Sequence, residues 1–325
     1  MYLLPKPKTI KEQDGQMLLC HSTHIVMTKE VAETEMHAAK RLQEAIRQET
    51  GLILPFSVGE VREGDLSLWI AKTVPEQTYE ITIDEKGGQI SGGDGAGVLY
   101  GVETFCQIVQ QCGGILPCVQ IQDAPDMPNR GYYFDQTRGR VLKLEELKKI
   151  ADRMCRYKLN QLQLYVEHTY LFRDFSEMWR DQTPLTAEEI RELDSYCRER
   201  HIELVPSLAS FGHLCTLLST KTYGDLCEME DSWKEPFSFW NRMRYHTINV
   251  SDERSLPLIK KMIAEYMQLF SSNKFNICAD ETFCLGKYKS KKLAEERGVH
   301  RLYIDYAKEL AQFLVENGKI PMCWG

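Results

Sequence analysis

Beyond residue 130, short apolar runs of strand length alternate with segments whose apolar residues recur at helical spacing. The strand-like runs cover residues 131–134, 162–166, 202–205, 275–279 and 320–324, and the helical stripes cover residues 144–154, 190–197 and 304–314. Thr186 and Glu189 form a capping box before the second stripe. Strands separated by helices pair in parallel through right-handed crossovers. The alternation therefore predicts an α/β fold, either a (β/α)8 barrel or an open doubly wound sheet.

The first 122 residues have a mixed pattern that predicts a small α+β domain. Apolar residues recur at helical spacing over residues 36–46 and 98–109, whereas residues 66–70 and 79–83 have strand patterns. A Lys-Gly-Gly turn then leads into residues 89–91, which predicts a hairpin. Two prolines within residues 123–129 forbid a continuing helix or inner strand there. We therefore predict a domain over residues 1–122, a linker over 123–129 and the strand–helix part over 130–325.

Composition narrows the classes of function. The 325 residues are 43% hydrophobic and 27% charged, a globular balance, and the formal net charge of −7 provides no bulk attraction for nucleic acid or for an anionic membrane. The chain has no run of about 18 apolar residues and begins without the apolar segment of a secretory signal. No glycine-rich phosphate loop follows a strand, and the spacing of the eleven cysteines suits no zinc site. We expect a cytoplasmic protein with reduced thiols, without a cofactor or a metal, and with neither nucleic acid nor membrane as a partner.

Polar residues stand at the end of every predicted strand beyond residue 130, which is where the chemistry of a (β/α)8 barrel is located. One such residue by itself is ordinarily a cap, a surface ion pair or a structural histidine. Independent surface groups would not be placed so regularly, so the set indicates a site. Its members are Asp135, Arg138, Glu167, His168, His213, Asp280, Glu281 and Trp324.

Asp280 and Glu281 are the most informative members of this set. Neighbouring residues in a regular strand face opposite sides, but both carboxylates can converge on one ligand where the strand breaks into a loop. Two carboxylates in a partly desolvated pocket push their pKa values apart, which supplies one proton donor and one anion at neutral pH. The pair therefore favours glycoside cleavage, although an Asp-Glu dipeptide is by itself common on surfaces.

With these residues in view, the chain resembles the family 20 glycoside hydrolases, the β-N-acetylhexosaminidases, over nearly its whole length. Five segments occur in the family's order, and Asp280-Glu281 matches its Asp-Glu signature. The segments are residues 130–138, 157–164, 202–213, 279–281 and 321–324, and residues 95–101 are similar to the domain that precedes the family's barrel. The resemblance implies a small α+β domain followed by a TIM-type (β/α)8 barrel, of which the first five strands are present.

The resemblance also implies the reaction, which is removal of a terminal β-linked N-acetylhexosamine (GlcNAc or GalNAc) from a glycan with retention. In this family the substrate's acetamido group is the nucleophile, and a cyclic oxazolinium forms. Glu281 would be the general acid and base, and Asp280 would hold the acetamido group. The other roles implied are hydroxyl binding by Arg138, support of the acid/base machinery by His213, a pocket wall from Trp324, and replacement by Glu167 of an acidic pair that contacts the counterpart of His213.

The chain also departs from the family pattern. Residues 276–279 stand where the family has a histidine and glycines, and Gly139 follows Arg138 where the family has a histidine. Because Trp324 falls on the fifth barrel strand, we expect the 325 residues to be part of a longer chain and to have little hydrolase activity alone. Two alternatives stay open: a non-catalytic sugar-binding protein on the same scaffold, and an acetamido-sugar hydrolase with a different carboxylate pair. The choice between GlcNAc and GalNAc and the oligomeric state are also open.

Overall fold

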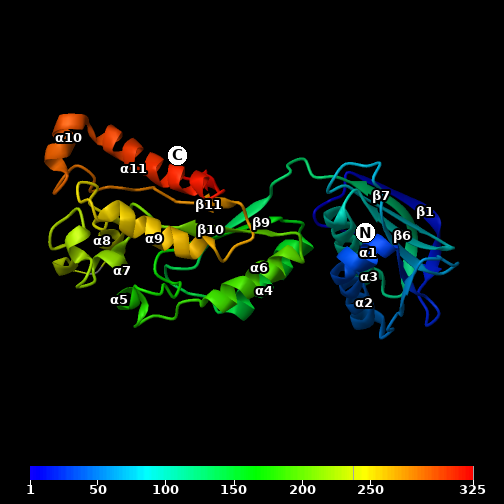
Figure 1. Cartoon of the computed structure of the whole chain (residues 1–325). Coiled ribbons are helices and arrows are strands. Elements are labelled where there is room, and N and C mark those ends of the chain that lie inside the picture. Colours follow the sequence, from blue (N-terminus) through cyan, green and yellow to red (C-terminus); the bar gives the residue numbers. More distant parts are fainter. Residues whose placement is uncertain (237, 325) are drawn as a thin grey trace. The chain divides into compact units, whose positions relative to one another are not determined.

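The computed structural model of the chain describes residues 1–236 and 238–324 and contains two compact units (Figure 1). The first unit comprises Met1–Gly131, Lys149–Asn160 and Cys197–Ile202. The second comprises Tyr132–Lys148, Gln161–Tyr196 and Glu203–Gly325. The first unit thus combines the N-terminal region with two short later segments, and the division into residues 1–122, 123–129 and 130–325 stays a prediction.

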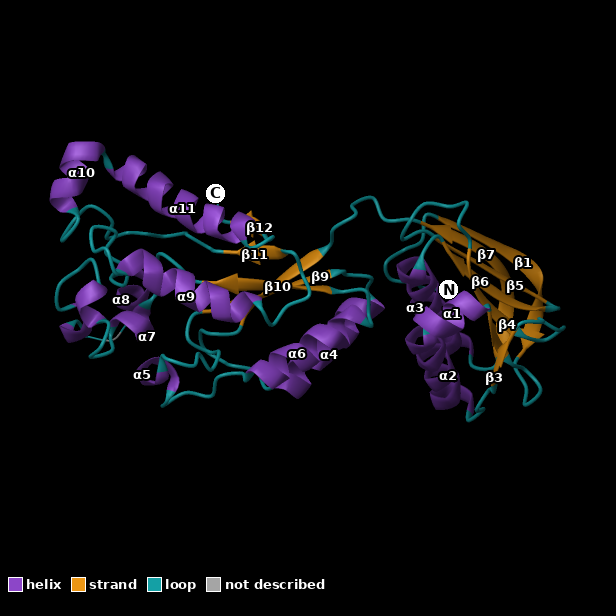
Figure 2. Cartoon of the chain, in the orientation of Figure 1, coloured by secondary structure: helices purple, strands orange, loops and turns teal. Residues whose placement is uncertain are grey.

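A seven-stranded mixed sheet forms the first unit, with the strand order β1-β7-β5-β6-β4-β2-β3. Helices α1, α2 and α3 lie on one face of this sheet (Figure 2). The helices predicted over residues 36–46 and 98–109 are confirmed as α2 and α3, and the predicted hairpin is the antiparallel pair β5–β6. The elements are β1 (Thr9–Leu18), β2 (Ile25–Met27), α1 (Lys29–Thr34), α2 (Met36–Thr50), β3 (Phe56–Val58), β4 (Leu66–Ile70), β5 (Tyr79–Asp84), β6 (Gly87–Gly92), α3 (Gly95–Cys112) and β7 (Ile115–Asp123).

Arg130 fixes the segment that follows β7. Its guanidinium donates hydrogen bonds to the carbonyl oxygens of Met127 at 2.7 Å and Lys158 at 2.8 Å, and to the Tyr100 hydroxyl at 3.0 Å. The stretch predicted as a linker is therefore held by defined hydrogen bonds within the first unit.

The sheet of the second unit has five strands in the order β12-β11-β10-β9-β8, so each strand lies beside its predecessor in the chain. Strands β9 to β12 pair in parallel, as predicted. This order, with helices between the strands, is consistent with a (β/α)8 barrel, and the closed barrel stays a prediction. The helices and strands from Gly131 onward, outside the excursion described next, are β8 (Gly131–Asp135), α4 (Leu144–Arg156), β9 (Gln161–Val166), α5 (Ser176–Trp179), α6 (Ala187–Arg198), β10 (Glu203–Leu208), α9 (Ser255–Met267), β11 (Lys274–Asn276), α10 (Lys291–Arg297), α11 (Val299–Glu316) and β12 (Ile320–Met322). Most of α4 and the end of α6 belong to the first unit.

The chain makes a long excursion of short helices between β10 and α9. It contains α7 (Cys215–Leu218), the 3-10 helices η1 (Gly224–Leu226) and η2 (Ser232–Lys234), and α8 (Phe239–Arg244). The periodicity of the sequence did not predict these elements, because each is shorter than the window over which a helical stripe becomes visible.

The structure confirms the predicted start of α6 and corrects the predicted end of β11. The capping box is confirmed, because the amide of Thr186 donates to Glu189 Oε2 at 2.8 Å and the amide of Glu189 donates to Thr186 Oγ1 at 3.1 Å. The strand predicted over residues 275–279 is too long, since β11 ends at Asn276. Cys278 and Ala279 have φ values of 59° and 61°, in the left-handed region, and a strand cannot continue through such residues.

The eleven cysteines are all free thiols in the structure, and their reduced state in the cell stays a prediction. Among the described residues, no helix combines the length and the apolar composition needed to cross a membrane. The cytoplasmic location stays a prediction.

Candidate active site

The predicted site residues follow the carboxyl ends of the strands of the second unit. Arg138 comes after β8, Glu167 after β9, His213 after β10, Asp280 and Glu281 after β11, and Trp324 after β12. Because the carboxyl ends of parallel strands meet at one edge of a sheet, these side chains gather at that edge. They form two contacting groups there, the carboxylate pair with His213, and Arg138 with Glu167.

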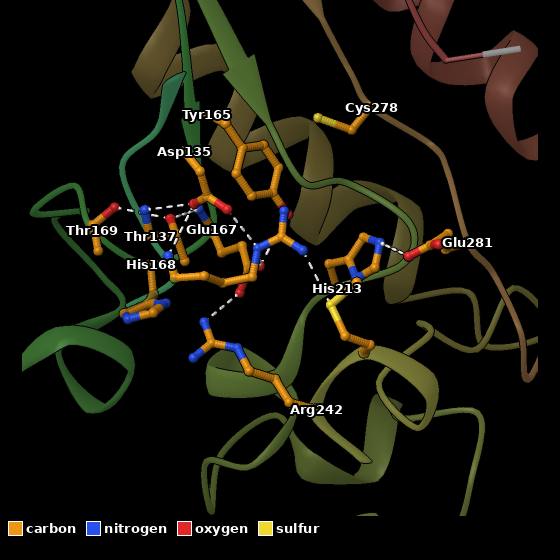
Figure 3. Close-up of polar contacts among 12 residues, drawn as sticks. Asp135, Thr137, Tyr165, Glu167, His168, Thr169, His213, Arg242, Cys278 and Glu281 are labelled. Atoms are coloured by element: carbon orange, nitrogen blue, oxygen red, sulfur yellow. Dashed lines mark hydrogen bonds and ion pairs between the residues drawn. The ribbon is translucent and has the colours of Figure 1, made fainter. Parts of the chain in front are cut away.

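The imidazole of His213 faces both carboxylates of the pair. Its Nε2 lies 3.2 Å from Glu281 Oε2 and 3.4 Å from Asp280 Oδ2, and Figure 3 shows the ring directed at Glu281. The His213 side chain is only 3% exposed, whereas that of Glu281 is 44% exposed. Both separations are within the range of an ion pair, but their geometry is not that of a hydrogen bond. Among the described residues, neither ring nitrogen of His213 therefore has a hydrogen-bond partner. Two adjacent carboxylates thus converge on one nitrogen, with Glu281 accessible from outside.

A left-handed backbone makes this convergence possible. His213, Cys278, Ala279 and Glu281 have φ values of 58°, 59°, 61° and 50°. Such values cost a non-glycine residue roughly 1–2 kcal/mol, and they cluster at functional sites. Cys278 and Ala279 therefore have a backbone conformation that glycine would adopt without strain.

One contact within the same segment and others from neighbouring loops hold this backbone in place. The Cys278 amide donates to Asn276 Oδ1 at 2.8 Å, and the Trp324 amide donates to the Cys278 carbonyl oxygen at 2.9 Å. Gly212 packs directly on the backbone of Asp280 and Glu281, since a Cβ at this position would lie 2.6 Å from the Asp280 carbonyl oxygen. Glycine at position 212 thus lets the loop after β10 approach the pair closely.

The surroundings of Asp280 keep its carboxylate ionised. Burial, the largest single influence, acts to raise the pKa of Asp280, but its contact with His213 and the charge of Arg138 outweigh burial and lower that pKa. Asp280 is therefore an anion at neutral pH. The more exposed Glu281 lies beside it, and this arrangement places a fixed anion next to an accessible carboxyl group.

Arg138 is oriented by its own turn. Its Nε donates to Asp135 Oδ2 at 2.7 Å, and Asp135 Oδ1 accepts the amides of Thr137 and Arg138 at 2.9 Å each. The guanidinium carbon lies 5.0 Å from the centre of the Tyr165 ring. The Nη1 atom donates to Met243 Sδ at 3.1 Å. Asp135, Tyr165 and Met243 therefore fix the guanidinium at the edge of the sheet.

Glu167 has a different partner from the one that the sequence suggested. It is 3% exposed, and its carboxylate accepts hydrogen bonds from Arg242 Nη2 at 2.9 Å and from the Tyr165 hydroxyl at 3.0 Å (Figure 3). Arg138 Nε is 3.9 Å away. Burial raises the pKa of Glu167, and Arg242 opposes that effect. In the described part of the chain Glu167 does not contact His213, so its suggested replacement of the family's acidic pair is corrected to pairing with Arg242.

Arg242 was not predicted from the sequence. It lies on α8, inside the excursion between β10 and α9, and not at the end of a strand. Burial and the charge of Arg242 lower the pKa of His168 to about 4, so that His168 is neutral near pH 7. His168 Nδ1 lies 3.2 Å from Thr216 Oγ1. His168 therefore contacts the excursion rather than the carboxylate pair.

Trp324 is 41% exposed. It follows β12 and Arg138 follows β8, so the two residues come from the two outermost strands of the sheet. Its ring meets Tyr133 in an edge contact with centroids 5.0 Å apart. The Tyr133 hydroxyl is in turn 3.1 Å from Ser207 Oγ. An aromatic surface thus stands beside the loop that carries Asp280.

Donor atoms of His213, Asp280 and Glu281 lie within 4.8 Å of one another, close enough to share a metal ion. Exposed acidic groups are common without one, and Glu281 is exposed. The arrangement of an anion, an accessible carboxyl and a histidine suits acid–base chemistry directly.

Two family models together match almost the whole chain. The model for "Glycosyl hydrolase family 20, domain 2" matches residues 1–124, and the model for the "Glycosyl hydrolase family 20, catalytic domain" matches residues 127–325. Among curated relatives, a β-hexosaminidase of Porphyromonas gingivalis is 24% identical over 99% of this chain and 45% of its own length. A β-hexosaminidase of Vibrio furnissii is 26% identical over 96% of this chain and 54% of its own length. The chain thus spans about half the length of these relatives.

Solved structures show the same fold. A chitobiase of Flavobacterium johnsoniae superposes with a TM-score of 0.85 at 20% identity, covering 99% of this chain and 52% of that one. An exo-β-N-acetylglucosaminidase of Vibrio harveyi in complex with N-acetylglucosamine superposes with a TM-score of 0.82 at 20% identity, covering 99% and 54%.

Proposed function

Because the chain belongs to glycosyl hydrolase family 20, we propose that the protein hydrolyses terminal non-reducing β-linked N-acetylhexosamine, GlcNAc or GalNAc, from glycans. The observation that carries the proposal is the convergence of Asp280 and Glu281 on His213, within 3.4 Å, at the carboxyl ends of the strands. The curated relatives compared above are β-hexosaminidases, and the Vibrio harveyi enzyme holds N-acetylglucosamine.

In the first step the substrate supplies the nucleophile. The carbonyl oxygen of its 2-acetamido group forms a bond to the anomeric carbon, and the bond from that carbon to the leaving oxygen breaks. Glu281 transfers its proton to the leaving oxygen. The acetamido nitrogen becomes part of a positively charged oxazolinium ring, and the Asp280 anion accepts its N–H and offsets that charge.

In the second step Glu281, now a carboxylate, takes a proton from water. The water oxygen bonds to the anomeric carbon from the face that the leaving group vacated, and the ring bond to the acetamido oxygen breaks. Two displacements at one carbon give net retention. Glu281 is protonated again at the end, so the cycle is closed.

The remaining residues have binding and positioning roles. The planar guanidinium of Arg138 suits vicinal hydroxyls of the terminal sugar. His213 supports the carboxylate pair, and Trp324 forms one wall of the acetamido pocket. Glu167 orients Arg138 and Arg242 through its buried carboxylate, rather than by contact with His213.

A chromogenic N-acetylglucosaminide tests the proposal. We expect the full protein to release the chromophore and a Glu281→Gln variant to release it far more slowly. The competing possibility is a non-catalytic sugar-binding protein on the same scaffold, and it predicts sugar binding without release in either form. Parallel assays with N-acetylgalactosaminide determine which hexosamine is preferred.

A further inference from the structure

The carboxyl group of Glu281 lies on an exposed side chain above a strained backbone. The side chain is 44% exposed and lies 3.2 Å from His213 Nε2, and the φ value of Glu281 is 50°, in the left-handed region. Backbone conformations of this kind persist only where the surrounding structure determines them. The position of the Glu281 carboxyl group therefore depends on what holds the chain that follows it.

The segment 281–290, which begins at Glu281 and ends at the start of α10, is a series of tight turns. Amide-to-carbonyl hydrogen bonds of 2.8–3.0 Å close these turns, and they run from Phe283 to Glu281, from Leu285 to Thr282 and from Lys287 to Cys284. Each turn is linked to the next, so a displacement at the far end of the segment is transmitted toward Glu281.

Glu228 anchors the far end of this segment. It lies in the excursion between β10 and α9 and is 0% exposed. Its Oε1 accepts hydrogen bonds from the Ser290 hydroxyl at 2.7 Å, from the Ser290 amide at 3.0 Å and from the Tyr288 amide at 3.2 Å. The Ser290 hydroxyl oxygen in turn accepts from the Gly286 amide at 3.0 Å. One buried carboxylate oxygen therefore holds three donors of the segment.

Other hydrogen bonds fix Glu228 itself and join the two segments nearer to the site. The Glu228 amide donates to the Thr247 carbonyl oxygen at 2.9 Å, within the excursion. The Cys284 thiol donates to the Arg244 carbonyl oxygen, also in the excursion, at 3.0 Å. The segment 281–290 is therefore attached to the excursion both near its start and at its end.

We propose that Glu228 is a positioning residue for Glu281, because it holds the segment 281–290 so that the Glu281 carboxyl group reaches the leaving oxygen. This inference rests on the proposed hydrolase function. Proton transfer requires the donor within hydrogen-bond reach of the oxygen, and a misplacement of about 1 Å can cost about 100-fold in rate. Loss of the anchor should therefore impair protonation of the leaving group more than binding of the terminal sugar, which is assigned to Arg138 and Asp280.

The geometry of the carboxylate determines the variants. Glu228→Met removes the acceptor and leaves its three donors without it. Glu228→Gln is the conservative variant, because it keeps an oxygen at the Oε1 position and loses only the 3.3 Å contact of Oε2 with the Ser290 amide. Ser290→Ala is a milder second disruption, since it removes only the hydroxyl between Gly286 and Glu228.

Asp194→Leu is the matched control. Asp194 is 3% exposed, and its Oδ1 accepts hydrogen bonds from the amide and the hydroxyl of Ser271 at 3.0 Å each. Ser271 comes just before β11, at the amino end of the strand, whereas the site lies at the carboxyl ends. Asp194 therefore makes the same kind of anchor as Glu228 on the side of the sheet away from the site.

The assay compares two substrates that differ in their need for a proton. Chitobiose, two β-linked N-acetylglucosamine units, has a poor leaving group and needs protonation, whereas a nitrophenyl N-acetylglucosaminide has a good leaving group and needs little. The value of kcat/KM is measured for both substrates with each variant of the full protein. A thiazoline analogue of the cyclic intermediate reports through its inhibition constant whether the sugar pocket is intact, and thermal unfolding reports stability.

We expect Glu228→Met to lower kcat/KM for chitobiose about tenfold or more beyond its effect on the nitrophenyl substrate, with the inhibition constant of the thiazoline within about threefold. Ser290→Ala should have the same effect to a smaller extent, and it decides the outcome if Glu228→Met does not fold. Glu228→Gln should retain most of the activity. Asp194→Leu should lower the unfolding temperature without changing the ratio of the two kcat/KM values.

An unchanged ratio in the folded Glu228→Met and Ser290→Ala variants, or an equal change in Asp194→Leu, would overturn the inference while leaving the hydrolase proposal intact. Absence of turnover of both substrates by the unmodified protein would overturn the proposed function and the inference together.

Discussion

Replacing Arg242 with methionine removes the guanidinium that pairs with the buried carboxylate of Glu167. In the structure this pair is 2.9 Å apart, and the Glu167 side chain is 3% exposed. After the substitution the carboxylate keeps the Tyr165 hydroxyl at 3.0 Å, with Arg138 Nε 3.9 Å away. Removing one partner of a buried ion pair costs about 3–5 kcal/mol. Because two partners remain, we expect the free energy of unfolding at pH 7 to fall by about 3 kcal/mol, the lower end of that range.

The loss should depend on pH with a defined sign. Burial already raises the pKa of Glu167, and removing Arg242 raises it further above the ordinary value of about 4.3. A carboxyl group with a higher pKa in the folded state contributes stability that is fully present at pH values below its unfolded pKa. That contribution is lost as the pH rises through the folded pKa. The destabilisation should therefore be small near pH 4.5 and largest at pH 7.

Urea denaturation of the full chain at both pH values measures this effect. The double variant Arg242→Met/Glu167→Gln should be more stable at pH 7 than Arg242→Met, because it removes the unpaired charge. As a matched control, Arg254→Met breaks the ion pairs of the 57% exposed Arg254 side chain with Asp225 and Asp252, and should cost about 1 kcal/mol or less per pair at either pH. Equal losses for Arg242→Met at the two pH values, or no recovery in the double variant, would refute the reasoning.

Three further predictions concern the carboxylate pair and its support. Glu281→Gln should lower turnover of a disaccharide by about 10²–10⁴-fold and affect a substrate with a good leaving group less; near-normal disaccharide turnover would remove Glu281 from the role. The thiazoline should inhibit at far lower concentration than N-acetylglucosamine, and Asp280→Asn should weaken it, whereas equal inhibition by the two compounds would indicate a protein nucleophile. Gly212→Ala should lower kcat about tenfold or more, because its Cβ would lie 2.6 Å from the Asp280 carbonyl oxygen, and a variant with wild-type kcat would show that the loops shift without effect.

The parallel pairing of the strands and the edge that carries the site followed from the sequence alone, whereas the order of the strands did not. Apolar runs separated by helical stripes determine a parallel sheet, and parallel strands bring their carboxyl ends to one edge. Arg138, Glu167, His213 and Asp280 could therefore be grouped from their positions after successive strands, without any knowledge of side-chain contacts. The capping box of α6 is equally local, since Thr186 and Glu189 are three residues apart.

Only the tertiary structure decided which of these groups touch. Hydrophobic periodicity carries no information on the path of the excursion between β10 and α9. The pairing of Glu167 with Arg242, 75 residues away, therefore had no signal in the local sequence. The early end of β11 was hidden for a different reason. Cys278 and Ala279 look like strand residues, but contacts that include those of Asn276, Gly212 and Trp324 hold them in the left-handed backbone that turns both carboxylates toward His213.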